Sequence, residues 1–226
     1  MMLTDLLDIN IPIIQAPMAG GVTTPDLVAA VCNAGGLGSV GAGYMSPDAL
    51  ITAIDKVRTL TDKKFQVNLF VPESHQANLV SQQKMATCIN EIASSLHINT
   101  QPVEPPYLPD FYQQVEVLLD KHVPIVSFTF GIPDKKIIQR FKSNNVILIG
   151  TATSLAEALA FEESGVDAIS LQSKEAGGHR GTFIGDVFDS LTDSATLISQ
   201  VFAKITLPVI AAGGIMNGQT TPGNGI

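Results

Sequence analysis

The chain has 226 residues, of which 45% are hydrophobic and only 15% charged, and its formal net charge is −8. A charged fraction below the usual ~25% indicates a large interior, which fits one large α/β domain. The negative charge and the lack of any Lys/Arg run argue against a nucleic-acid partner, which would need a basic face. The amino terminus has no signal-peptide pattern and no apolar run approaches ~18 residues, so we expect a cytoplasmic protein without a membrane span.

The cysteines and most of the histidines give no sign of a metal site. Cys32 and Cys88 lie far apart in helical patterns, so we expect both to be buried apolar-like residues rather than zinc ligands or a disulfide. His75, His97 and His122 have no partner at metal-ligand spacing, and we expect surface or structural roles for them.

Strand-like and helix-like segments alternate along the first third of the chain. Thr24 and Ser46 are each followed by proline, which predicts capped helices that begin there, the second running to about Leu60. Short apolar runs predict strands over residues 11–18, 37–41 and 65–71.

Residues 72 to about 110 interrupt this alternation. A polar, weakly helical portion over 76–96 is followed by a segment with four prolines between Pro102 and Pro109, which favours an extended, stiff chain. We interpret 72–110 as an insertion that is either the edge of a lid or a surface strap.

The alternation resumes after the insertion. Ser154 with Glu157 three residues later matches a capping box, which predicts the start of a helix that ends near Gly165. A second, shorter insertion is expected over 182–189. The remaining helices are predicted over 110–121, 134–142 and 190–203, and the remaining strands over 124–131, 146–153, 168–172 and 208–214.

Seven strands alternating with helices predict a TIM-type (β/α)8 barrel that is incomplete at its C-terminal end, with about seven βα units. Residues 217–226 show neither a helical period nor a strand pattern. We therefore expect one barrel domain over 1–226, with the insertion at about 72–110 and an atypical tail at 217–226.

The loop after the sixth predicted strand has the composition of a binding site. Gly177 and Gly178 allow close approach to the backbone, and His179 follows directly. Since α/β folds bind ligands beyond the carboxyl ends of their strands, we predict a functional role for His179. Asn68 lies near the carboxyl end of another apolar strand, where its amide needs a partner, and a ligand is one such partner.

Several segments resemble the nitronate monooxygenases, formerly called 2-nitropropane dioxygenases, which are FMN-dependent barrels. The pair EAGGHRG (175–181) and VSFTFG (126–131) is fairly specific to these enzymes, whereas AAGGI (211–215) occurs in many FMN barrels. The other matching segments are QAPMAGGVTTPDL (15–27), AGGLGSVGAG (34–43), VNLFVP (67–72) and GTATSLAEA (150–158).

This resemblance implies a set of cofactor contacts and a reaction. Asn68 and Gln172 would hydrogen-bond the polar edge of the isoalloxazine ring, and His179 would take a proton from the carbon beside the nitro group or orient the nitronate. FMN would oxidise the nitronate with O₂ to a carbonyl compound and nitrite. The remaining implied contacts are packing of the ring against Ala16, Pro17 and Met18 and binding of the phosphate at Gly177, Gly178, Gly213 and Gly214.

Two alternatives stay open at this point. One is an FMN-dependent enoyl-acyl-carrier-protein reductase or NAD(P)H:quinone reductase of the same superfamily. The other is a truncated and inactive remnant, because family members continue after the AAGGI strand with a helix and an eighth strand that completes the phosphate site. The sequence does not indicate the oligomeric state.

Overall fold

The computed structural model describes residues 2–72, 79–100 and 107–215. The chain forms two compact units, one of Met1–Pro72 with Pro109–Ile226 and one of Glu73–Leu108. The second unit covers the segment that the sequence suggests as an insertion, and its described helix is α4 (Leu79–Ser95). The single-domain interpretation stays a prediction, and the tail at 217–226 lies outside the described residues.

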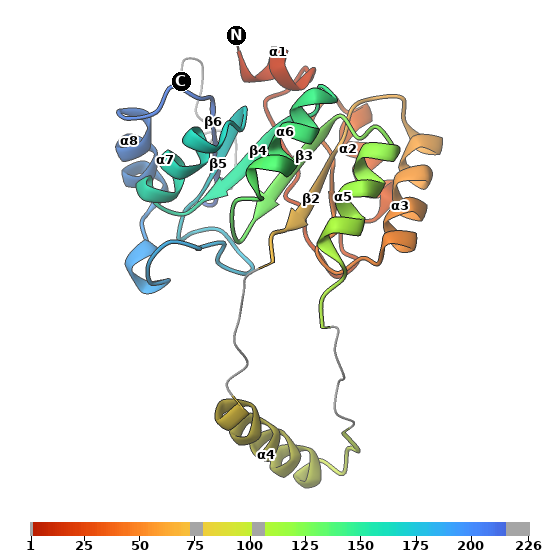
Figure 1. Ribbon diagram of the computed structural model, residues 1–226, viewed down its shortest axis with the longest axis vertical. Helices are drawn as coiled ribbons and strands as arrows, with labels where there is room; N and C mark the ends of the chain where they lie inside the picture. Colours follow the sequence, from red (N-terminus) through yellow and green to blue (C-terminus); the bar gives the residue numbers. More distant parts are fainter. Residues whose placement is uncertain (1, 73–78, 101–106, 216–226) are drawn as a thin grey trace. The chain divides into compact units, whose positions relative to one another are not determined.

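The first unit is built on a curled half-barrel of parallel strands in the order β1 to β6 (Figure 1). Each strand pairs with the next one along the chain, which is the topology of a βα barrel. The register places Gly41 beside Asn68 and Asn68 beside Ser127. The strands are β1 (Ser39–Gly41), β2 (Gln66–Phe70), β3 (Ile125–Thr129), β4 (Ile147–Ala152), β5 (Ala168–Gln172) and β6 (Val209–Ala212).

The prediction of a first strand over residues 11–18 is wrong in its extent. This segment forms only one parallel bridge, between Ile14 and Leu37, with Leu37 N donating to Ile13 O and Gln15 N to Leu37 O, each at 2.9 Å. Pro12 and Pro17 flank the bridge and have no backbone N–H, so they cannot extend the ladder as donors.

The helices mostly begin where the sequence predicts. Thr24, Ser46, Asp110 and Ser154 each accept a hydrogen bond from a backbone N–H of the first helical turn, as N-caps do. The helices of this unit are α1 (Leu3–Leu7), α2 (Pro25–Asn33), α3 (Pro47–Leu60), α5 (Phe111–Asp120), α6 (Lys135–Ser143), α7 (Leu155–Ser164) and α8 (Ser194–Phe202).

The helix predicted from Ser190 begins four residues later. A 3₁₀ turn (Phe188–Ser190) occupies its expected start, and Asp193 caps α8 by accepting from Thr196 N at 2.9 Å. A carboxylate is a strong start signal for a helix, because it accepts hydrogen bonds from the free backbone amides of the first turn and complements the helix dipole. None of the described helices is long and apolar enough to cross a membrane.

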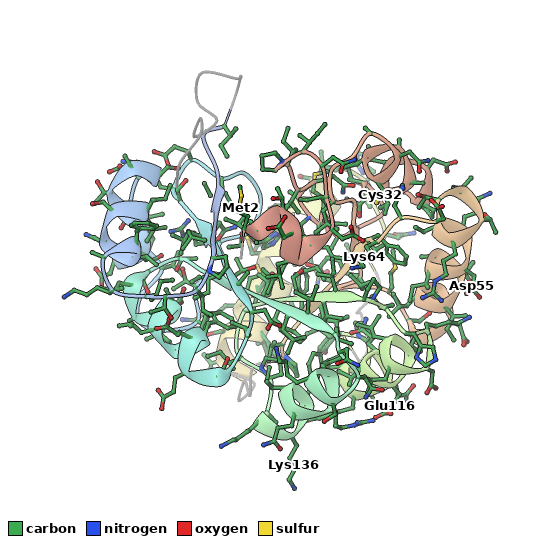
Figure 2. The ribbon with its side chains drawn as sticks, turned by 90° about the horizontal axis from the view of Figure 1, so that it is seen from above. Met2, Cys32, Asp55, Lys64, Glu116 and Lys136 are labelled. Atoms are coloured by element: carbon green, nitrogen blue, oxygen red, sulfur yellow. The ribbon has the colours of Figure 1, made fainter. Side chains whose placement is uncertain are left out.

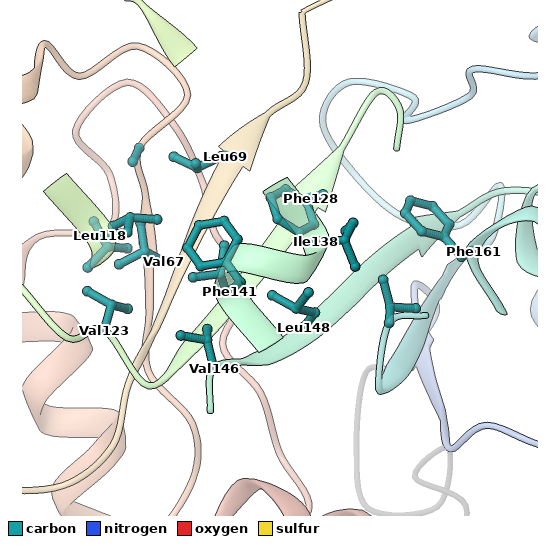
Figure 3. Close-up of a cluster of buried hydrophobic side chains, with 14 of the residues drawn as sticks. Val67, Leu69, Leu118, Val123, Phe128, Ile138, Phe141, Val146, Leu148 and Phe161 are labelled. Atoms are coloured by element: carbon teal, nitrogen blue, oxygen red, sulfur yellow. The ribbon is translucent and has the colours of Figure 1, made fainter. Parts of the chain in front are cut away.

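The main core lies between the sheet and the helices that surround it (Figure 3). Val67, Leu69, Phe128 and Leu148 point outward from the strands and are fully buried against helix residues such as Phe141. Since side chains alternate along a strand, the residues between these point toward the inside of the half-barrel.

The inside of the half-barrel is apolar near the amino ends of its strands. There Ile125, Ile149 and Ala168 form a second buried cluster with Leu7 of α1. Figure 2 shows α1 within the arc of the surrounding helices. With this end filled by side chains, the opposite end is the one available for a site.

One of the two cysteine predictions is confirmed and the other is wrong. Cys32 is buried in α2, and burial raises the pKa of its thiol. Cys88 is exposed on α4. The physical reason is that α4 is the one helix described in its compact unit, so this unit provides no second layer to cover the thiol.

Candidate functional site

A row of polar side chains crosses the inner face of the sheet near the carboxyl ends of β2 to β5. Asn68 Nδ2 donates to Ser127 Oγ at 3.0 Å and to Thr129 Oγ1 at 3.1 Å. Thr129 Oγ1 lies 3.5 Å from Thr151 Oγ1 on the next strand. Gln172 ends β5 on the same side, so one continuous polar surface lines this end of the half-barrel.

Asn68 is only half satisfied within this row. Its side chain is 1% exposed, yet its Oδ1 has no hydrogen-bond partner among the described residues. A buried acceptor without a donor costs about 1–3 kcal/mol, so such an oxygen indicates a missing donor. The sequence located this need for a partner correctly but could not show that only the oxygen is unpaired.

The segment with Ala16, Pro17 and Met18 lies against the end of β1, beside Asn68. Thr23 Oγ1 donates to Met18 O at 3.0 Å and accepts from Gly41 N at 3.0 Å, which ties the segment to the strand. A Cβ on Gly41 would come within 2.6 Å of the Met18 backbone. The glycine is therefore required for this close approach, and Thr23 is a positioning residue that sequence reasoning missed.

His179 lies on an exposed loop held by the amide of Gln172. Gln172 Nε2 donates to His179 O at 2.9 Å, and its Oε1 accepts from Gly181 N at 2.7 Å. The imidazole itself forms no hydrogen bond with any residue that the structure describes. One amide hydrogen and one lone pair of Gln172 remain for another partner.

The two glycine pairs expected to bind phosphate lie beside each other. A Cβ on Gly213 would meet Ser173 Oγ at 2.4 Å and Ala176 N at 2.5 Å, so this glycine packs directly under the chain that leads to Gly177. Gly178 and Gly213 have positive φ values of 81° and 113°, which favour glycine. Gly177 and Gly178 are exposed with open space around them, and Gly214 follows Gly213 in the same turn.

Arg180 holds the histidine loop in place through hydrogen bonds to backbone carbonyls. Its guanidinium donates to Gln172 O and Ser173 O, each at 2.7 Å, and to Ser190 O. Burial lowers the pKa of Arg180, and the charges of Glu157 and Glu175 oppose that shift. Each of these bonds ends on a backbone carbonyl, so the guanidinium ties the chain at the end of β5 to the end of the segment 181–190.

Glu157 holds the same segment from α7 and corrects the capping-box prediction. Ser154 Oγ accepts from Glu157 N, but the Glu157 carboxylate does not return to the Ser154 backbone. It is fully buried, where Oε2 accepts from Thr153 N at 2.6 Å and Oε1 from Phe183 N at 2.5 Å and Ile184 N at 2.9 Å. The sequence showed only the capping-box spacing of Glu157 and gave no signal for this role.

Arg180→Met is expected to destabilise the protein by about 2–3 kcal/mol, because the variant keeps the alkyl stem but leaves three carbonyl oxygens without their charged donor. Arg180→Lys will not restore stability, since one ammonium group cannot reach the same carbonyls as a planar guanidinium. Urea unfolding measures the difference. Arg140→Met is the control, because its ion pair with Glu116 is solvent-exposed and its loss should change stability little; Figure 2 shows Glu116 at the outer edge of the unit. Equal losses for the two methionine variants would contradict the anchoring role.

The described residues contain no group of three or more His, Cys, Asp or Glu side chains that could hold a metal ion. The site is instead an amide, hydroxyl and glycine surface that runs from the Met18 segment to the Gly213 turn. Such a surface suits a planar polar ring and an anionic group.

A family model described as nitronate monooxygenase matches residues 1–221. The chain belongs to the nitronate monooxygenase family. A probable nitronate monooxygenase from Staphylococcus aureus (strain Newman) is 44% identical over 218 residues. That match covers 96% of this chain and 61% of the relative, so the chain spans less than two thirds of the relative's length.

Two solved structures of related proteins share the fold. Nitroalkane oxidase from Streptomyces ansochromogenes is 40% identical, with a TM-score of 0.86 over 96% of this chain and 61% of its own. FabK from Thermotoga maritima is 33% identical, with a TM-score of 0.71 over 96% of this chain and 55% of its own. The incomplete TIM-type barrel and the family resemblance are thus confirmed.

Proposed function

We propose that the carboxyl end of this half-barrel binds FMN and oxidises alkyl nitronates to carbonyl compounds and nitrite with O₂. The observation that carries the cofactor assignment is Asn68 Oδ1, a buried acceptor without a donor beside the Met18 segment. An isoalloxazine ring has a polar edge with an N–H group that matches this need. When bound, the flavin supplies electron transfer between the organic substrate and O₂.

The residues around Asn68 fit the rest of the cofactor. The backbone of Ala16, Pro17 and Met18 offers a surface close to β1 for the ring. Gln172 retains one donor and one acceptor for the ring's polar edge. Gly177, Gly178 and Gly214 are exposed and leave backbone amides accessible to the phosphate, and Gly213 lets the Gly213–Gly214 turn pack closely against the chain that leads to Gly177.

The names of the relatives support the choice of substrate. The nitroalkane oxidase resembles this chain more closely than FabK does in both identity and TM-score. Two nitronates and one O₂ give two carbonyl compounds and two nitrites, which balances atoms and charge. His179, with its unbonded imidazole at the mouth of the site, takes the proton from the carbon beside the nitro group or orients the nitronate.

The test measures flavin binding and nitrite release with the same preparations. The purified chain is mixed with FMN, dialysed and examined by visible absorption, and nitrite is then measured with ethyl nitronate under air. Because the chain spans 61% of the relative, a chimera that continues from residue 215 with the relative's remaining segment is assayed in parallel. We expect bound flavin and nitrite from at least one of these two proteins.

The controls separate the alternatives. Asn68→Leu should abolish flavin uptake by the chain or the chimera, whichever of the two binds FMN, since leucine offers no hydrogen-bond acceptor. Rapid NADH oxidation without nitrite release would overturn the proposal in favour of a reductase. Failure of both proteins to bind FMN would overturn the assignment of this surface as a flavin site.

A further inference from the structure

Three aromatic rings form a row beyond the ends of β1, β2 and β3. Tyr44 and Phe70 have ring centroids 5.5 Å apart at an interplanar angle of 86°, and Phe70 and Phe130 are 4.8 Å apart at 75°. Both pairs have the edge-to-face geometry that aromatic side chains prefer. We call Tyr44, Phe70 and Phe130 the aromatic row.

The aromatic row adjoins the polar surface of the site. Phe70 follows Asn68 by two residues on β2, so both side chains point to the inner face of the half-barrel. Phe70 is also the register partner of Thr129, whose hydroxyl accepts from Asn68. The aromatic row therefore begins two residues beyond Asn68 along β2. It lies on the β1–β3 side of the half-barrel, whereas His179 follows β5.

The backbone is adapted to hold these rings. Phe130 has φ = 70°, a left-handed conformation that is strained for a bulky residue. A Cβ on Gly43 would come within 2.2 Å of the Phe70 ring, so no other residue could occupy position 43 without displacing that ring. Strain and a missing side chain at adjoining positions are typical of functional sites.

The rings are nevertheless only partly covered. Tyr44 is 55% exposed, and Phe70 and Phe130 are intermediate in burial, in contrast to the fully buried Phe128, two residues before Phe130 on the outer face of the sheet. A row of partly exposed apolar rings beside a polar site provides area that an apolar part of a ligand can cover.

We propose that the aromatic row binds the alkyl chain of the substrate and makes the enzyme selective for longer unbranched chains. This inference rests on the proposed function, because it places the chain of the nitronate against the row and its polar head toward the histidine loop. Each methylene that the row covers should improve kcat/KM about fourfold, the fold-change that corresponds to about 0.8 kcal/mol per buried CH₂.

The decisive variant is Phe130→Gly, because glycine accepts a positive φ without strain. Removing this ring should leave the urea midpoint unchanged or raised, while the gain per methylene from ethyl to pentyl nitronate falls from about fourfold to about twofold or less. Tyr44→Ala is a second variant at an exposed position, with the same direction expected. Phe188→Ala is the control, because this ring is 81% exposed on the 182–190 segment and outside the row.

A calorimetric titration separates this proposal from the function on which it rests. Unbranched alkyl carboxylates share the planar, anionic head of nitronates, so their Kd values should show the same chain-length dependence and the same loss in Phe130→Gly. If nitrite release fails but this dependence holds, the aromatic row stands and the proposed reaction falls. If Phe130→Gly keeps the full chain-length dependence in both measurements, the row is structural and the proposal is overturned.

Discussion

His179→Asn is expected to lower nitrite release from nitroethane by about 10²–10⁴-fold while flavin absorption stays unchanged. This range is the usual contribution of a positioned general base, and asparagine keeps a similar size without the ability to take the proton. The imidazole forms no hydrogen bond with any residue that the structure describes, so its removal should leave the fold intact. The loop backbone is held separately, through Gln172 and Arg180.

A comparison of two substrates shows which role His179 has. Nitroethane must lose a proton before oxidation, whereas ethyl nitronate has already lost it. If His179 is the base, the variant fails with nitroethane but retains most of its activity with ethyl nitronate. If His179 orients the anion, activity falls with both substrates.

His122→Asn is the matched control for this experiment. His122 is exposed just before β3, at the amino end of the strand, and asparagine tolerates its positive φ of 47°. It should retain full activity with both substrates. Equal activities of the His179 and His122 variants would remove His179 from the mechanism.

Glu157→Ala is expected to destabilise the protein by about 3–5 kcal/mol, because it leaves the backbone amides of Thr153, Phe183 and Ile184 without their buried acceptor. Glu157→Gln should lose about half as much, since its amide nitrogen replaces one of the two accepting oxygens. Urea unfolding at constant m-value measures both losses. Limited proteolysis should show cleavage within 182–189 before global unfolding.

Glu163→Ala provides the control on the same helix. Its side chain is exposed, so the change in unfolding free energy should stay within about 0.5 kcal/mol. A loss below about 1 kcal/mol for Glu157→Ala would mean that water replaces the carboxylate and that the segment 181–184 does not depend on it.

Local patterns in the sequence were sufficient for the element order and for most of the helix starts. A buried parallel strand needs a continuous apolar run, and a helix needs an acceptor for its first amides, so both leave signals within a few residues. The succession of these signals predicted the barrel topology. His179, Asn68 and the glycine pairs were found for the same reason, because each stands out from its immediate neighbours.

The tertiary structure decided which partner each polar group has. Glu157 has the spacing of a capping box, but the amides of Phe183 and Ile184 lie closer to its carboxylate than the Ser154 backbone does. The partners of Arg180 are carbonyls on both sides of the loop, and within the Asn68 amide it is the oxygen and not the nitrogen that lacks a partner among the described residues. Hydrogen bonds between distant segments depend on how the folded chain brings those segments together. The local sequence does not record that arrangement.

The same distinction explains the aromatic row and the first strand. Nothing in the sequence predicts the left-handed conformation of Phe130 or the contact of its ring with Phe70. The apolar run at 11–18 predicted a full strand, yet only Ile14 forms a bridge between the two prolines. The sequence by itself thus determined the order of elements and the kinds of residue at the site, whereas the folded chain determined their contacts, because those contacts join residues that are far apart in sequence.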